Sequence, residues 1–146
     1  MPFTATTRDS NDPDHFRLEL RTDISRVGDV VETVRSRCFD RDVPSPRAQF
    51  RLCTVLAEAV ANAMLYGNGG DPARHVIIEV DFQDDRFVIA VSDEGDGFDH
   101  SAIPLPICDE SRAATRGRGL FMIHRLAEGV HFNDRGNTIW MTLPRR

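Results

Sequence analysis

The stretch LAEAVANAMLYG, residues 56–67, has the Leu- and Ala-rich composition of a buried helix, yet it carries a carboxylate and a carboxamide. Its apolar residues recur at helical spacing and predict one buried face. Glu58 and Asn62 are four positions apart, so they project side by side, about 40° from each other around the helix axis. Taken alone, the pair is most simply the polar flank of a helix. The alternative is the edge of a site where the amide oxygen holds Mg²⁺ and the carboxylate accepts a proton.

The composition is that of one soluble globular domain of 146 residues, 40% hydrophobic and 28% charged. The formal net charge is −5 and no basic stretch interleaves with aromatic residues, which argues against nucleic-acid binding. No apolar run approaches the roughly 20 residues that a membrane span needs. Residues 1–15 lack the apolar core of a signal peptide, so we expect a flexible N-terminal tail, followed by one folded domain at residues 16–146.

Cysteine and lysine usage narrows the possible chemistry. Cys38, Cys53 and Cys108 form no C-x-x-C pair, which fits a reducing cytoplasm and argues against structural zinc. All 18 basic residues are arginine. Without lysine, the chain has neither a Walker A loop nor the strand lysine of the usual protein kinases, and Schiff-base chemistry is excluded. Any phosphate must therefore be held by backbone N–H groups, arginine and metal.

Apolar periodicity and turn residues predict the order strand, two helices, hairpin, lid, helix and hairpin. The predicted strands are residues 16–21, 75–82, 86–93, 130–134 and 137–143, and the predicted helices are residues 27–37, 46–66 and 119–128. Residues 98–116 contain two prolines and no clear period, which predicts a functional lid or a disordered segment. This order predicts an α+β fold, in which a layer of helices covers one face of a mostly antiparallel sheet.

The segment VSDEGDGFD, residues 91–99, places an acid at the end of a predicted strand and two glycines behind it. An acidic turn is the simplest interpretation. An EF-hand calcium loop is excluded, because Gly95 and Gly97 stand where oxygen ligands are needed and Pro104 stands where the bidentate glutamate belongs. The glycines favour a flat ligand that approaches the backbone closely. An ionised Asp93 could then accept a hydrogen bond from an amino group such as that of adenine.

The segment TRGRGLFMIHRL, residues 115–126, places Gly117 and Gly119 immediately before a predicted helix. The first N–H groups and the dipole of a helix favour an anion, and Arg116 and Arg118 add positive charge beside it. Simple helix capping is the alternative. The third glycine of a dinucleotide-binding fingerprint is missing.

These three motifs stand in one order along the chain: E-x-x-x-N on a helix, D-x-G-x-G after a strand, a long lid, then R-G-x-G-L into a helix. In this order the chain resembles the GHKL (Bergerat-fold) ATPase superfamily. Within that superfamily it is most similar to the small anti-sigma factor serine/threonine-protein kinases of bacterial partner-switching systems. The resemblance covers about residues 16–143. Tyr66 departs from it, because members commonly have a histidine at that position.

The resemblance implies a two-layer sandwich of the histidine-kinase-like ATPase type that binds ATP and Mg²⁺. Glu58 would be the general base, Asn62 would coordinate Mg²⁺, and Asp93 would recognise the adenine amino group. The other binding positions that it implies are Gly95, Gly97, Arg116, Gly117, Arg118, Gly119 and Thr138. In this interpretation one of the two arginines supplies the charge that a lysine supplies in other kinases.

The resemblance also implies a function. The chain would phosphorylate a serine of an anti-anti-sigma (STAS-type) partner and sequester a sigma factor, as a cytoplasmic homodimer. One alternative is a nucleotide-dependent switch that binds a partner without phosphorylating it, but a switch needs no base, so Glu58 favours the kinase. The other alternative is the catalytic half of a histidine kinase. The sequence shows neither the phosphoacceptor helix pair nor the sensor of such a kinase, which weakens this alternative.

Overall fold

The computed structural model describes residues 4–6, 14–40, 45–97 and 112–146. The elements within these ranges are β1 (Thr4–Thr6), β2 (His15–Arg21), the 3₁₀ turn η1 (Ile24–Arg26), α1 (Val27–Cys38), α2 (Pro46–Asn62), the π-helical turn η2 (Ala63–Gly67), β3 (His75–Phe82), β4 (Arg86–Asp93), α3 (Arg112–Leu126), β5 (Gly129–Phe132) and β6 (Thr138–Pro144).

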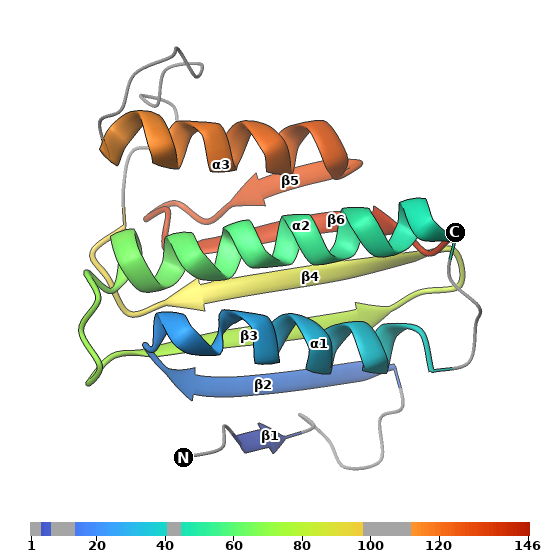
Figure 1. The fold of residues 1–146 in the computed structure, drawn as a ribbon, viewed down its shortest axis with the longest axis horizontal. Coiled ribbons are helices and arrows are strands. Elements are labelled where there is room, and N and C mark those ends of the chain that lie inside the picture. The colour runs from blue at the N-terminus through green and yellow to red at the C-terminus, as the bar shows by residue number, and fades with distance from the viewer. Residues whose placement is uncertain (1–3, 7–13, 41–44, 98–111) are drawn as a thin grey trace.

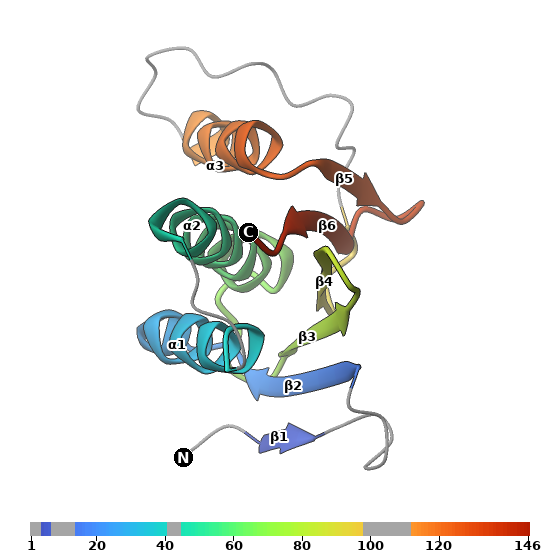
Figure 2. The same cartoon turned by 90° about the vertical axis from the view of Figure 1, so that its right-hand side faces the viewer.

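The strands form one sheet in the order β1-β2-β3-β4-β6-β5, and every neighbouring pair is antiparallel. Helices α1, α2 and α3 lie side by side over one face of this sheet, seen from the helical side in Figure 1 and edge-on in Figure 2. Alternate strand residues fill the space between the two layers, among them the fully buried Leu18, Ile78, Ile89 and Met141. This architecture confirms the predicted α+β fold.

Helix α2 begins as the sequence predicts. The Ser45 hydroxyl oxygen accepts a hydrogen bond of 3.0 Å from the Ala48 N–H, and Pro46 occupies the first turn, where a helix needs no N–H. The apolar face of the helix is buried against the sheet at Leu52, Val55, Leu56 and Ala59. Packing of this face, rather than helix propensity, holds α2 in place.

The chain leaves α2 through the wider turn of η2. The Asn68 N–H donates to the Ala63 carbonyl at 2.8 Å, and the Gly70 N–H donates to the Met64 carbonyl at 2.8 Å. The sequence predicts an unbroken helix to about residue 66, whereas regular α-helix ends at Asn62 and the rest is π-helical. Such turns are frequent at functional sites, and this one carries the chain toward the end of β4.

The largest boundary differences concern the N-terminal tail and the start of helix α3. The strand β1 pairs with β2, so residues 4–6 of the predicted flexible tail belong to the sheet edge. Helix α3 begins at Arg112, so residues 112–116 of the predicted lid are helical, while residues 98–111 of that lid lie outside the described residues. The sequence predicts a helix that starts at residue 119, yet Gly117 and Gly119 lie within α3, although glycine disfavours helix interiors.

The two described cysteines are free thiols within helices. Cys38 ends α1 and is buried, whereas Cys53 of α2 is partly buried. Burial raises the pKa of Cys38 to about 12, because desolvation disfavours the thiolate. Cys38 therefore behaves as a small apolar side chain of the core.

The burial of α2 yields a test of the fold. Leu56 is fully buried, so we expect Leu56→Ala to lower the free energy of unfolding by about 2–5 kcal/mol, measured by urea denaturation. The matched control is Phe50→Ala on the same helix, where the side chain is 56% exposed and the expected change is within about 0.5 kcal/mol. Equal losses in both variants would contradict the orientation of α2.

Candidate functional site

Glu58 and Asn62 lie on the side of α2 that packs against α3. A Cβ atom at position 119 would lie 2.6 Å from Oε2 of Glu58 and 3.5 Å from Nδ2 of Asn62, so glycine at 119 lets α3 approach both side chains. Within the described ranges the Glu58 carboxylate has no hydrogen-bond or ion-pair partner, and the buried Nδ2 of Asn62 has no hydrogen-bond partner either. The predicted pair therefore lies against α3, and its polar groups can still bond to a ligand.

The α3 glycines take a different role from the one that the sequence predicts. Because α3 starts at Arg112, Gly117 and Gly119 do not precede the helix, and their N–H groups lie beyond its first turn. The prediction of a helix N-terminus at these glycines is wrong. Both glycines are buried, and Gly119 packs on Glu58. Arg118 is exposed on α3, whereas the side chain of Arg116 lies outside the described residues.

A pocket of about 360 Å³, part of it open to solvent, lies beside Asn62 between α2, α3, β4 and the β5–β6 hairpin. Asn62, Asp93 and Thr138, which the sequence singles out, are among its polar lining residues. The remaining lining residues are Ala59, Ala63, Val91, Leu120, Ile123, Phe132, Gly136, Asn137 and Ile139. A mostly apolar pocket with a few polar groups is the usual form of a small-molecule site.

Asp93 is the last residue of β4, and its carboxylate is held from two sides. Its Oδ1 accepts a hydrogen bond of 2.8 Å from the Gly95 N–H. On the other side, a Cβ atom at Gly67 would lie 2.2 Å from Cγ and from Oδ2 of Asp93. The sequence predicts Gly67 only as a helix end, whereas the structure shows that it makes room for the Asp93 carboxylate.

The two glycines after Asp93 are needed for contacts within the protein. A Cβ atom at Gly95 would lie 1.9 Å from the carbonyl oxygen of Gly67. A Cβ atom at Gly97 would lie 1.6 Å from the carbonyl oxygen of Arg135, and Gly97 also has a φ of +85°. We expected these glycines to make room for a flat ligand. In the structure they make room for the protein's own backbone, so they shape the pocket indirectly.

Asn68 is a positioning residue that the sequence analysis missed. Its side chain is buried and donates to the Thr22 hydroxyl at 2.9 Å and to the His75 carbonyl at 3.0 Å. Its amide oxygen accepts from the Glu94 N–H at 2.8 Å. Asn68 thus ties the end of η2 to the turn after β4. An asparagine behind a helix-ending glycine looks like ordinary turn chemistry, so the sequence gives little signal for this role.

Thr138 opens β6 on the opposite wall of the pocket. Its hydroxyl donates to the Ser92 hydroxyl at 2.9 Å, and its N–H donates to the side-chain oxygen of Asn133 at 3.1 Å. The Asn137 side chain donates to the Gly95 carbonyl at 3.3 Å. These bonds connect the β5–β6 turn to the Asp93 turn and give the pocket one polar wall.

The residues present fit ATP with Mg²⁺. No cluster of three His, Cys, Asp or Glu side chains that could hold a metal occurs among the described residues, which excludes an all-protein cage there. Mg²⁺ commonly takes one or two protein oxygens and obtains its other ligands from waters and phosphates. The unpartnered amide of Asn62 could supply such an oxygen after rotation about its last torsion, and Asp93 offers an acceptor in the same pocket.

Comparison with known families agrees with this geometry. The family described as histidine kinase-like ATPase domain matches residues 17–143, which include Glu58, Asn62, Asp93 and Thr138. The chain belongs to this family. No helix in the part of the chain that the structure describes has the length and apolar character to cross a membrane.

Two individual proteins are similar to this chain. An anti-sigma F factor from Oceanobacillus iheyensis is 30% identical over 95 residues, which are 61% of this chain and 64% of that protein. The chain thus matches less than two thirds of the length of that relative. The catalytic domain of the histidine kinase ThkA, solved without nucleotide, has a TM-score of 0.49 and 13% identity over 99% of this chain and 98% of that one.

The contact between Gly95 and Gly67 can be tested by adding one methyl group. We expect Gly95→Ala to lower the free energy of unfolding by about 1–3 kcal/mol, because the new Cβ would force the Gly67 carbonyl to move. Gly28→Ala in α1 is the control. Nothing lies within 4 Å of its Cβ, so it should be neutral or stabilise by up to about 1 kcal/mol. Chemical denaturation measures both, and an unchanged Gly95→Ala would refute the contact.

Proposed function

We propose that this chain is an ATP-dependent protein serine/threonine kinase and anti-sigma factor. It phosphorylates a serine of a STAS-type anti-anti-sigma partner and sequesters a sigma factor. The ATPase family supports the nucleotide chemistry, and the similarity to an anti-sigma F factor supports the partners. The observation that carries the proposal is Glu58, a carboxylate without a partner among the described residues, one helical turn from Asn62 of the pocket.

The proposed binding roles follow from the pocket. The Asp93 carboxylate accepts a hydrogen bond from the adenine amino group, and Thr138 with Ser92 forms the polar wall beside it. The Asn62 amide oxygen is a ligand of Mg²⁺. Bound Mg²⁺ neutralises phosphate charge. Gly95 and Gly97 keep the Asp93 turn in place through their contacts with the protein backbone.

The proposed chemical step uses Glu58 as the general base. The carboxylate accepts the proton of the partner's serine hydroxyl, while the serine oxygen bonds to the γ-phosphorus and the bond from that phosphorus to ADP breaks. Positive charge beside the phosphates comes from α3, where we assign Arg116 or Arg118 to this role. Gly119 acts by allowing close approach of α3 to Glu58 and Asn62 on α2.

We further propose that the protein acts in the cytoplasm as a homodimer. Residues 16–146 form the kinase domain, to whose sheet β1 (Thr4–Thr6) adds an edge strand. Direct contact with nucleic acid or membrane is not part of this function.

The nucleotide site can be tested by thermal melts. With Mg-ADP at 100 times its Kd, the parent should gain about 2.7 kcal/mol of stability and melt at a higher temperature. Asp93→Asn should lose most of this shift, because one acceptor oxygen is replaced by a donor. Asp96→Asn, an exposed position in the same turn, should keep it. No shift for the parent at millimolar nucleotide would refute the site.

The base can be tested with Glu58→Gln, which preserves size but removes the proton-accepting charge. Transfer of labelled γ-phosphate to a STAS-type partner should fall by roughly 10²–10⁴-fold. Mg-ADP affinity should change little, because Asp93 and Asn62 provide the binding contacts. The matched control is Glu128→Gln at an exposed glutamate after α3, which should transfer at the parental rate.

The same assay separates the kinase from its alternatives. Parental transfer by Glu58→Gln would remove Glu58 from the mechanism. Nucleotide binding without transfer to any STAS-type partner would favour the non-catalytic switch. Acid-labile label on the acceptor would indicate phosphohistidine and the histidine-kinase type, whereas phosphoserine survives acid.

A further inference from the structure

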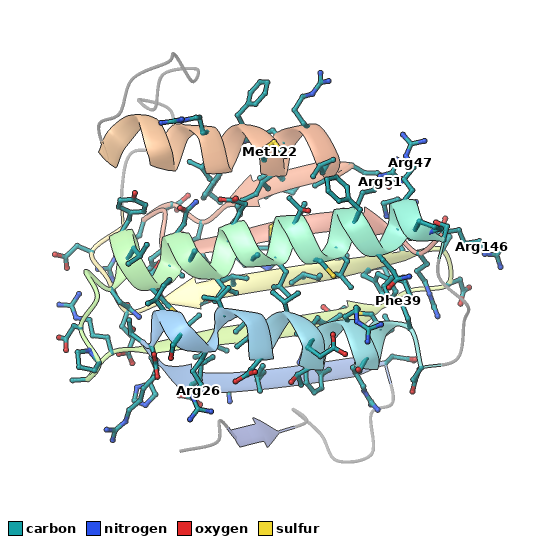
Figure 3. The ribbon with its side chains drawn as sticks, viewed as in Figure 1. Arg26, Phe39, Arg47, Arg51, Met122 and Arg146 are labelled. Atoms are coloured by element: carbon teal, nitrogen blue, oxygen red, sulfur yellow. The ribbon has the colours of Figure 1, made fainter. Side chains whose placement is uncertain are left out.

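The outer side of α2 and α3 carries arginines and exposed apolar side chains that the proposed chemistry does not use. We call Arg47, Phe50, Arg51, Met122 and Arg125 the arginine patch. Its α2 members share one face of the helix at spacings of three and four residues, and its α3 members are three residues apart. Phe50 is 56% exposed and Met122 is 36% exposed. Figure 3 shows Arg47 and Arg51 projecting from the N-terminal end of α2, on the helical side that also carries Met122.

The patch is a local excess of positive charge on an acidic protein. The formal net charge of the chain is −5, yet the patch contains no acid. Five other arginines pair with carboxylates, namely Arg17, Arg26, Arg35, Arg74 and Arg86. Within the described ranges, none of the three arginines of the patch forms an ion pair. Its charge therefore remains available for an acidic group outside this chain.

Arg47, Arg51 and Glu58 share one face of α2, because they are spaced by four and seven residues. Helices α2 and α3 run side by side in opposite directions (Figures 1 and 2) and touch where Glu58 meets Gly119. From this contact, Arg51 is about two turns back along α2 and Arg125 nearly two turns on along α3. Arg51 and Arg125 therefore lie at about the same level, roughly 10 Å from Glu58 along the helix axes, and Arg47 lies one turn farther, about 16 Å away.

We propose that the arginine patch docks an acidic segment of the phosphoacceptor protein and thereby holds the acceptor hydroxyl at Glu58. This inference rests on the proposed kinase function. Carboxylates of the partner pair with the arginine guanidinium groups, which suit planar carboxylates, and apolar side chains of the partner cover Phe50 and Met122. The partner surface should therefore present acids about 10–16 Å from its acceptor serine, the range of axial distances from the patch arginines to Glu58.

Other occupants are less well supported. Arginines with exposed aromatic groups also suit an anionic lipid surface, and the acidic surface of a second copy could pair with them. A protein hydroxyl must reach Glu58 for the proposed reaction, and Arg47 and Arg51 lie on the same face of α2 as Glu58, so the acceptor protein is the occupant that the arrangement favours.

The test compares two double charge reversals. The probe is the STAS-type protein, from the set encoded in the same genome, that the parent phosphorylates fastest. Arg47→Glu with Arg51→Glu should lower kcat/KM for this probe at least about tenfold, while kcat at saturation and Mg-ADP affinity stay unchanged. Added salt should lower the kcat/KM of the parent, and it should lower the kcat/KM of the variant much less.

The matched control is Arg21→Glu with Arg86→Glu. These positions lie on β2 and β4 in alternation with residues buried under the helices, so their side chains leave the opposite face of the sheet. This variant changes the net charge by the same amount and should keep the parental kcat/KM. An acid-to-arginine change on the probe should restore activity of the patch variant, which a purely structural role of the patch would not allow.

Each alternative outcome overturns the docking proposal in a recognisable way. Unchanged kcat/KM in the patch variant, with an active parent, refutes docking and leaves the kinase intact. Loss of binding to phosphatidylserine vesicles with unchanged kcat/KM assigns the patch to a membrane. Dissociation of a parental dimer in sedimentation, with unchanged kcat/KM, assigns it to a second copy. No transfer by the parent to any STAS-type protein refutes the kinase function together with the docking.

Discussion

The backbone of Gly67 passes so close to the turn at Asp93–Gly95 that a side chain fits at neither glycine. The Gly67 carbonyl would lie 1.9 Å from a Cβ at Gly95, and the Asp93 carboxylate lies against Gly67 itself. Asn68 secures the same junction with three hydrogen bonds to Thr22, His75 and Glu94. The end of α2 and the end of β4 are thereby joined, which places Asp93 and Asn62 in one pocket.

Helix α2 connects the three functions that we assign to the helical layer. Its apolar face packs on the sheet, its last turn supplies Asn62 to the pocket, and Glu58 faces α3 at Gly119. Its first turns carry Arg47 and Arg51 on the outer side. A partner held by the patch would therefore be placed by the same rigid element that places the proposed base, which favours reproducible alignment of the reacting groups.

Most helices and strands can be predicted from the sequence, because apolar periodicity and turn residues are local signals. Strands β3 and β4 match residues 75–82 and 86–93, since both are short runs rich in valine and isoleucine that end at turn residues. Prediction from the sequence fails where a tertiary contact overrides the local preference of a residue. Gly117 and Gly119 signal a helix start, but they lie inside α3, where Gly119 packs on Glu58. The roles of Asn68 and Gly95 are missed for the same reason, because each depends on a residue far away in the sequence. Gly95 contacts Gly67, and Asn68 donates to Thr22.

The most direct test of the account is a crystal structure of the protein with Mg-ADP. The proposed function predicts the adenine amino group within about 2.7–3.2 Å of the Asp93 carboxylate, in the pocket that Thr138 lines. It also predicts Mg²⁺ at about 2.0–2.1 Å from the side-chain oxygen of Asn62. A nucleotide bound outside this pocket, or one whose adenine makes no contact with Asp93, would contradict the account.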